Sequence, residues 1–267
     1  MMDKFSKICS DIKSIKIQGA TNVAKAAINA YCLNPTKKSI KTLTKLRPTE
    51  PMVVNSLNAV RRSSVEGVLN HFDNAQEFVN HYVQKLIKKD MVIFTHCHSN
   101  TLAQALIAAK KNKKSFSVIN TETRPLYQGH ITSKQLAKAG IKVTLSVDSG
   151  ILQDIEKADV IMLGADAVTK KGVINKIGSG LIAKIASDLK KPLYIITDSW
   201  KLSLKKIPIE KRSSDEVWKD YPKKVIVENP AFELIPKKQI SSIISELGIM
   251  TPKQFFKEAK KSLKNYS

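Results

Sequence analysis

The sequence predicts an α/β protein in which a small helical unit is followed by a mostly parallel sheet with helices on both faces. Two observations predict this class. Up to about residue 88, apolar residues recur at helical spacing. From Asp90 onward, short apolar runs alternate with helical segments, which is typical of parallel strands joined by helices. We therefore place a helical N-terminal domain at 1–88 and an α/β domain at 89–267.

The helices of the N-terminal domain are predicted from apolar spacing and from one start signal. Segment 23–27 consists mainly of strong helix formers. Thr49-Glu50-Pro51 is typical of a helix start, because proline is favoured in the first turn. A further amphipathic helix is expected over 72–89. The apolar positions at helical spacing are Phe5, Ile8, Ile12 and Ile15, and then Val53, Val54, Leu57 and Val60.

Six strands are predicted in the second domain, and the residues that follow them are unusually polar or small. The strands are expected at 91–96, 115–120, 141–147, 158–166, 191–197 and 223–229, with helices at 102–110, 133–139 and 181–189 between them. In such sheets a ligand binds outside the carboxyl ends of the strands. The first five strands end in His96-Cys97-His98, 120–124, Asp148, 164–166 and 198–201. These ends predict a small-molecule pocket at one edge of the sheet.

The charge and the cysteine content narrow the class of protein. The net charge is +22, but the excess is lysine spread along the chain, with only five arginines and 6% aromatic residues. Surfaces that read nucleic acid usually concentrate arginine and aromatic side chains, so specific nucleic-acid binding is not expected. Three cysteines argue against a disulfide framework. No membrane span or signal peptide is recognisable, and we expect a cytoplasmic protein with no membrane partner.

Cys97 is the first candidate for chemistry, because it lies between two histidines directly after the apolar run 91–94. A zinc site would need further ligands, and the chain has neither a CxxC pair nor HExxH spacing. We therefore expect no metal. Two alternatives remain open for this segment alone: an inert buried thiol, or a thiolate stabilised by helix N-terminal amides and nearby cations.

Asp166 and three further segments are the other candidates. Asp166 follows an apolar strand and is either a turn or helix-capping residue or an acid–base group with a raised pKa. The small residues of NKIGSG (175–180) and of QGAT (18–21) precede helices, where backbone amides can bind an oxyanion. Arg47 is either a phosphate clamp or a member of a surface ion pair.

Several multi-residue segments together resemble one family, in which the regulatory α, β and δ subunits of translation initiation factor 2B are joined by two sugar-phosphate isomerases. These are methylthioribose-1-phosphate isomerase and archaeal ribose-1,5-bisphosphate isomerase, and THCHS resembles the second most closely. The resemblance implies a helical N-terminal domain followed by a Rossmann-like domain. The segments are LRPTEPMVVNSLNAV (46–60), FTHCHSNTLAQAL (94–106), TETRPLYQGHITSKQLAKAGIKVTLSVDSG (121–150), LGADAVTKKGVINKIGSG (163–180) and ENPAFELIP (228–236).

The resemblance also implies roles for individual residues. The isomerases of the family use the cysteine of THC and the aspartate of GAD, which are Cys97 and Asp166 in this chain, and they need no metal or cofactor. One departure is Gln18, where the family's enzymes commonly have arginine in the first phosphate loop. The implied phosphate and sugar contacts are Gln18, Gly19, Ala20, Thr21, Arg47, Ser99, Arg124, Gln128, Asn175, Lys176 and Lys201.

The expected activity is therefore that of an aldose–ketose isomerase acting on a phosphorylated pentose. The most similar branch of the family suggests conversion of ribose 1,5-bisphosphate to ribulose 1,5-bisphosphate by acid–base catalysis. The alternative is a non-catalytic regulatory protein that binds translation initiation factor 2, a nucleotide or a sugar phosphate. By resemblance we also expect a homo-oligomer, either a dimer or a hexamer.

Overall fold

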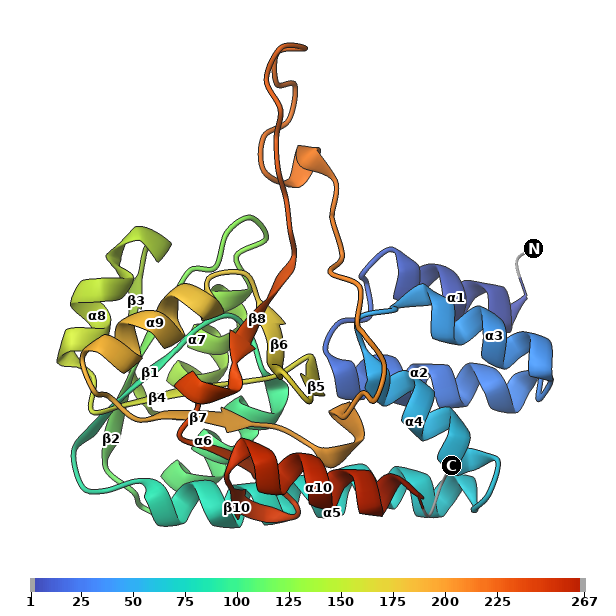
Figure 1. Cartoon of the computed structure of the whole chain (residues 1–267), viewed down its shortest axis with the longest axis horizontal. Helices are drawn as coiled ribbons and strands as arrows, with labels where there is room; N and C mark the ends of the chain where they lie inside the picture. Colours follow the sequence, from blue (N-terminus) through green and yellow to red (C-terminus); the bar gives the residue numbers. More distant parts are fainter. Residues whose placement is uncertain (1–2, 265–267) are drawn as a thin grey trace.

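A computed structural model describes residues 3–264, and its N-terminal part is helical as the sequence predicts (Figure 1). The first four helices there share a core formed mainly by Ile12, Val23, Leu43 and Leu57, whereas the fifth packs against the rest of the molecule. Their bounds are α1 Lys4–Lys13, α2 Ala20–Leu33, α3 Lys37–Leu46, α4 Pro51–Val60 and α5 Val65–Leu86. The predicted domain boundary at 88 falls between α5 and the first strand, and it stays a prediction.

The main sheet has seven strands in the order β10-β9-β7-β4-β1-β2-β3. All neighbouring strands are parallel except β10, which pairs antiparallel with β9. The sheet is therefore mostly parallel, as predicted. The strands are β1 Met91–Thr95, β2 Phe116–Thr121, β3 Lys142–Ser146, β4 Val160–Leu163, β7 Leu193–Ile196, β9 Ser242–Ser245 and β10 Gly248–Met250.

Helices cover both faces of this sheet, and alternate strand residues point to them. Ile93 and Val160 face a core shared with α5, α6 (Asn100–Lys111) and α7 (Gln128–Lys138). Phe94 and Ile161 face the opposite core, shared with α8 (Ile151–Lys157), α9 (Ser179–Asp188) and α10 (Pro252–Lys264). This two-sided burial explains why the strands are nearly continuous apolar runs in the sequence.

A second, antiparallel sheet of three strands lies beside the main one, and sequence patterns did not predict it. Its order is β5 (Ala167–Thr169), β6 (Gly172–Lys176) and β8 (Phe232–Pro236). Four short 3-10 helices complete the described elements: η1 Asp148–Gly150, η2 Ser199–Lys201, η3 Ser214–Glu216 and η4 Lys237–Gln239.

The predicted sixth strand at 223–229 is wrong. This segment belongs to an extended arm, roughly residues 203–230, that projects from the body of the molecule (the orange segment in Figure 1). Ile226 is 86% exposed there, so its apolar side chain has no core to face. In the main sheet the strand that pairs with β7 on its outer side is β9.

No helix within residues 3–264 combines the length and apolar character needed to cross a membrane.

Candidate active site

The candidate site lies at the switch point of the main sheet, where β1 pairs with β2 on one side and β4 on the other. Crevices at such reversals of strand order are the usual ligand sites of open α/β sheets. Cys97 follows β1 and Asp166 follows β4, so both lie at this point. The two strand ends approach closely: a Cβ at Gly164 would lie 2.6 Å from Cβ of Ser99.

A cavity opens at this point, and it brings together residues from distant parts of the chain. Of the catalytic and contact residues that the family resemblance implies, only Arg124 does not line it; the Arg124 guanidinium donates instead to the Tyr127 hydroxyl and the Val217 carbonyl. Among the strand ends, Asp148 and Asp198 do not line it either. Sequence reasoning missed Glu50, Arg212 and Phe232, which do line the cavity. The residues named from sequence that line it are Gln18, Gly19, Ala20, Thr21, Arg47, Cys97, Ser99, Gln128, Asp166, Asn175, Lys176 and Lys201.

Cys97 has a backbone conformation that non-glycine residues rarely adopt. Its φ is +68°, in the left-handed region, because β1 ends at Thr95 and the chain turns before α6 begins. The Thr123 hydroxyl accepts from the Cys97 amide at 2.9 Å, and the Thr132 hydroxyl donates to its carbonyl at 2.9 Å. A left-handed residue of this kind costs roughly 1–3 kcal/mol, and such strain clusters at functional sites.

Burial keeps the Cys97 thiol uncharged. It raises the pKa of Cys97 to about 12, and the nearby Lys176 ammonium offsets only part of this rise. The sequence left open either a thiol or a stabilised thiolate at Cys97. The raised pKa indicates that the ligand-free protein holds the protonated thiol at neutral pH.

Alkylation should show this protonated state directly. At pH 7.5 iodoacetamide should modify Cys97 about 50-fold or more slowly than an exposed thiol, because a higher pKa leaves less thiolate despite its greater nucleophilicity. Exposed Cys32 is the internal reference, and peptide mass spectrometry measures both rates in one sample. Equal rates at the two residues would contradict the assignment.

The two histidines beside Cys97 are neutral and hold the surrounding loops. The His96 Nε2 contacts the Ile177 carbonyl at 2.9 Å; since a carbonyl only accepts, Nε2 carries the proton and Nδ1 accepts from Thr121. The Thr132 hydroxyl already donates to Cys97, so Nδ1 of His98 donates to it at 2.9 Å. Burial lowers the pKa of both histidines. Neither ring is free to bind a metal through these nitrogens.

Asp166 is a buried carboxyl group beside several cations. Burial raises its pKa, and the positive charges of Lys201, Arg47 and Lys176 oppose that rise. The Asp166 amide donates to the Ile174 carbonyl at 2.9 Å, which fixes the residue at the start of the β5–β6 hairpin. It is thus neither exposed nor the N-cap of a helix, and a carboxyl group with a raised pKa is suited to donate a proton.

Arg47 belongs to a buried ion pair, not to the surface pair considered from sequence. Its Nη2 lies 2.6 Å from Oε1 of Glu50, and the two side chains are 8% and 2% exposed. Nε and Nη1 of Arg47 are buried without a hydrogen-bond partner among residues 3–264. Burial raises the pKa of Glu50 to about 7, against the lowering effect of Arg47. An oxyanion in the cavity would satisfy the unused donors.

The N-terminus of α9 does not offer its amides to a ligand, contrary to the expectation for NKIGSG. Oε1 of Glu233 accepts from the amides of Gly178 and Gly180 at 2.6 and 2.8 Å. Gly178 has φ +100°, and a Cβ there would lie 3.0 Å from Nε2 of His96. Only Asn175 and Lys176, at the end of β6, line the cavity from this segment.

The N-terminus of α2 does face the cavity. Gly19 is its N-cap with φ +83°, and no side chain caps the helix. Gly19, Ala20, Thr21 and Asn22 all line the cavity. The first amides of a helix and its dipole favour an anion at this position.

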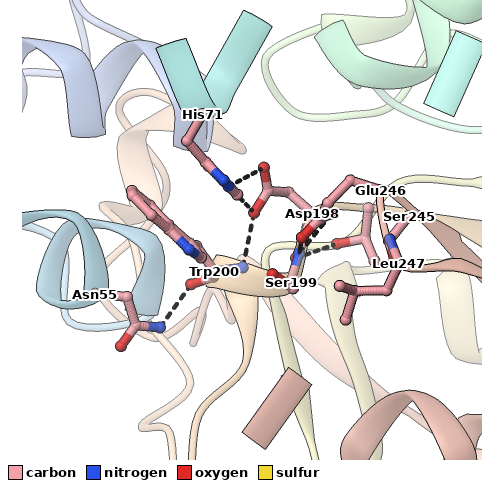
Figure 2. A network of polar contacts seen from close by, with 9 residues as sticks. Asn55, His71, Asp198, Ser199, Trp200, Ser245, Glu246 and Leu247 are labelled. Atoms are coloured by element: carbon pink, nitrogen blue, oxygen red, sulfur yellow. Dashed lines mark hydrogen bonds and ion pairs between the residues drawn. The ribbon is translucent and has the colours of Figure 1, made fainter. Parts of the chain in front are cut away.

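Lys201 belongs to the turn at 198–202, and a clamp of polar contacts on Asp198, Ser199 and Trp200 holds this turn (Figure 2). Nζ of Lys201 donates to the Ala165 carbonyl at 2.7 Å, next to Asp166. Asn55 of α4 donates to the carbonyls of Trp200 and Leu202 at 2.7 and 2.9 Å. Asp198 stabilises this turn, because its Oδ1 accepts from the Trp200 amide at 2.7 Å. It does not line the cavity.

His71, Asp198 and Glu246 form the rest of this clamp, and their possible ligand atoms lie within 4.8 Å of one another. The His71 ring stacks on Trp200 at 3.9 Å and contacts both Asp198 oxygens at 3.2–3.3 Å. Glu246 accepts from the Ser199 amide at 3.1 Å. Because hydrogen bonds already use these atoms, we interpret the cluster as structural (Figure 2).

The clamp should make stability depend on pH. Burial, with Asp198 nearby, raises the pKa of Glu246 from 4.5 to about 7. A raised pKa in the folded state gives stability that is complete below about pH 4.5 and is lost as pH rises through 7. The side chain in Glu246→Gln stays neutral at both pH values. Raising the pH from 5 to 8 should therefore increase the free energy of unfolding of this variant, relative to that of the wild type, by about 2–3 kcal/mol.

Urea unfolding of both proteins at the two pH values measures this shift. Glu228→Gln, which removes an exposed carboxylate of the arm, is the matched control and should show no comparable shift. A Glu246→Gln difference that is the same at pH 5 and pH 8 would refute the assignment.

The fold and the cavity together define an α/β protein with a small-molecule site at the switch point of its sheet. The chain belongs to the initiation factor 2 subunit family, whose model matches residues 20–252. It is 33% identical to ribose 1,5-bisphosphate isomerase of Archaeoglobus fulgidus, over 96% of this chain and 92% of that protein. With such relatives at 30% identity or more, the chain is an enzyme of the isomerase class.

Solved structures agree on the fold. The translation initiation factor eIF-2B of Pyrococcus horikoshii superposes with a TM-score of 0.85, over 95% of this chain and 99% of that one. The 5-methylthioribose 1-phosphate isomerase of the same organism gives 0.75, over 99% and 88%. Both are 24% identical to this chain, and at this identity the similarity supports the fold only.

Proposed function

We propose that the chain isomerises ribose 1,5-bisphosphate to ribulose 1,5-bisphosphate, with Cys97 and Asp166 as the acid–base pair. The observation that carries this is the shared cavity: the half-buried residues Cys97 and Asp166 line it together, and the Lys176 charge acts on both. The relatives named ribose 1,5-bisphosphate isomerase support the choice of substrate.

The reaction moves one hydrogen from C2 to C1, and one proton passes from the C2 hydroxyl to the ring oxygen as the ring opens. Cys97 removes the proton from C2 and returns one to C1, while Asp166 gives its proton to the ring oxygen and recovers one from the C2 hydroxyl. Burial raises the pKa of Asp166, which favours the proton-carrying form of this carboxyl group relative to an exposed aspartate. The base form of Cys97 must first be made, since its pKa is about 12. At pH 7 this costs roughly 7 kcal/mol, which fits within the barrier of about 16 kcal/mol for a turnover of ~10 per second.

Binding of the phosphate groups positions the reacting carbons. The first residues of α2, Arg47 and Lys176 all line the cavity. Fixing both partners of a proton transfer in place supplies much of the rate in such reactions. The proton transfers themselves use only side chains of this chain.

An assay of the purified protein with several pentose phosphates tests the proposal. Ribose 1,5-bisphosphate should be converted, and ribose 5-phosphate should be a much poorer substrate. Inactivity on every pentose phosphate, together with salt-resistant capture of translation initiation factor 2, would instead favour the regulatory alternative.

We also propose that the chain forms homo-oligomers. The edge strand β3 and the following segment expose Leu145, Val147 and Leu152, which are 44%, 56% and 50% exposed. Apolar side chains gathered in this way are typical of interaction surfaces. Sedimentation equilibrium should therefore give a mass of two or more chains.

A further inference from the structure

Arg212 reaches the cavity from the base of the arm. The arm's two sides pair there: the Arg212 amide donates to the Asn229 carbonyl at 3.0 Å, and the Ala231 amide donates to the Glu210 carbonyl at 2.9 Å. From this pairing the rest of the arm extends away from the body (Figure 1). The Arg212 side chain is only 7% exposed, and it lines the cavity together with Lys176.

The guanidinium of Arg212 is poorly satisfied for a buried charge. Nε is buried and donates no hydrogen bond; Oε1 of Glu210 lies 3.4 Å away but is not aligned with the N–H. The other ion pair, from Nη1 to Oε2 of Glu216, is 4.0 Å long. Glu210 is also shared with Arg47, whose Nε is 3.8 Å from Oε2. Buried donors without acceptors are costly, so an acceptor supplied by a ligand would be favourable.

Lys176 lines the same cavity, and no carboxylate within residues 3–264 forms a close ion pair with it. It is 4% exposed, and its Nζ makes no hydrogen bond within residues 3–264. Lys176 and Arg212 line the same cavity. Burial lowers the pKa of Lys176 and the Arg212 charge lowers it too, whereas Glu216 and Asp166 raise it. Two neighbouring cations repel, and an oxyanion bound to both would offset the repulsion.

We infer that Arg212 and Lys176 bind one phosphate group of the substrate, and that the N-terminus of α2 binds the other. A guanidinium fork matches the oxygens of a phosphate and binds two of them at once. Arg212 thus brings a guanidinium to a cavity whose first phosphate loop has Gln18 in place of arginine. The inference rests on the proposed function and deepens it, because two separate anion subsites select a sugar bisphosphate over a monophosphate.

Calorimetric binding of ribulose 1,5-bisphosphate to the full-length protein tests the inference. Arg212→Met should raise Kd by about 10- to 150-fold, the loss expected for hydrogen bonds to a charged group. Its affinity for the bisphosphate should then approach the wild-type affinity for ribulose 5-phosphate. Arg212→Lys, which keeps the charge and loses the fork, should fall between the two. Arg47 still pairs with Glu210 in these variants, and thermal unfolding verifies that they fold.

Lys211→Met is the matched control, because it removes an exposed positive charge from the adjacent position of the arm. It should leave Kd within about twofold of wild type, since exposed charges at this distance are screened by salt. Equal Kd values for Arg212→Met and Lys211→Met would overturn the inference, as would failure of the wild type to bind the bisphosphate.

Turnover by the same preparations separates the two claims. If the wild type isomerises ribose 1,5-bisphosphate and Arg212→Met binds the product normally, the Arg212 subsite fails and the proposed function stands. If the wild type binds the bisphosphate through Arg212 but does not isomerise any pentose phosphate, the proposed function fails and the subsite stands.

Discussion

Replacing Asp166 with asparagine should lower kcat for ribose 1,5-bisphosphate by about 10²- to 10⁴-fold, because the amide cannot donate the proton that the sugar oxygen requires. This loss corresponds to about 3–5.5 kcal/mol of transition-state stabilisation. Asparagine has nearly the shape of the protonated carboxyl group, which the buried site already favours. The variant should therefore fold normally and bind the bisphosphate with little change in Kd.

A coupled assay of product formation measures kcat, and calorimetry measures Kd on the same sample. A kcat within about threefold of the wild-type value would remove Asp166 from the mechanism. A kcat loss accompanied by an equal loss of affinity or of folding would show instead that the residue is structural.

Replacing Cys97 with serine should have an effect of similar size, also about 10²- to 10⁴-fold on kcat. A hydroxyl group is a much weaker acid than a thiol, so the base form that removes the carbon-bound proton becomes still harder to make. The side chain remains small and polar, and the hydrogen bonds of Cys97 to Thr123 and Thr132 use only its backbone. The loop should therefore keep its conformation.

Cys32→Ser is the matched control, because Cys32 is exposed and lies at the end of α2. It should leave kcat unchanged. Full activity of Cys97→Ser would return Cys97 to the inert thiol that the sequence segment alone allowed.

The architecture of the main sheet could be predicted because its central strands are buried on both faces. Apolar runs such as 91–94 alternate with helical segments only in that arrangement, and five of the six predicted strands lie in the sheet. The prediction failed at 223–229, where Val225, Ile226 and Val227 look like a strand. Local pattern does not show whether a partner strand is present, and in the structure this segment lies in the arm.

Short elements were also missed. β5, β6 and α8 have between three and seven residues, which is too few for a clear periodicity. The segment NKIGSG was interpreted as an anion loop. Glycines before a helix occur at anion sites but also at other helix starts, so the pattern alone does not distinguish the two. The carboxylate that occupies the α9 N-terminus comes from Glu233, more than 50 residues later, and the sequence around α9 does not predict this contact.

Some cavity residues could likewise be predicted from local sequence patterns, and others could not because they depend on long-range contacts. The residues after β1 and β4 could be placed together because parallel strands end at one edge of the sheet. Arg212 could not be placed, since the part of the arm around it has neither helical nor strand periodicity. Arg124 was included by resemblance, but Tyr127 and Val217 hold its guanidinium away from the cavity.

The most direct test of the central claim is an NMR time course with ribose 1,5-bisphosphate labelled with carbon-13 at C1. For the wild type, the label should move from the anomeric carbon signal to that of a CH₂ group bearing phosphate, as the ketose forms. Asp166→Asn and Cys97→Ser should leave the anomeric signal nearly unchanged over the same time. An unchanged signal with the wild type, or equal conversion by all three proteins, would contradict catalysis by this pair.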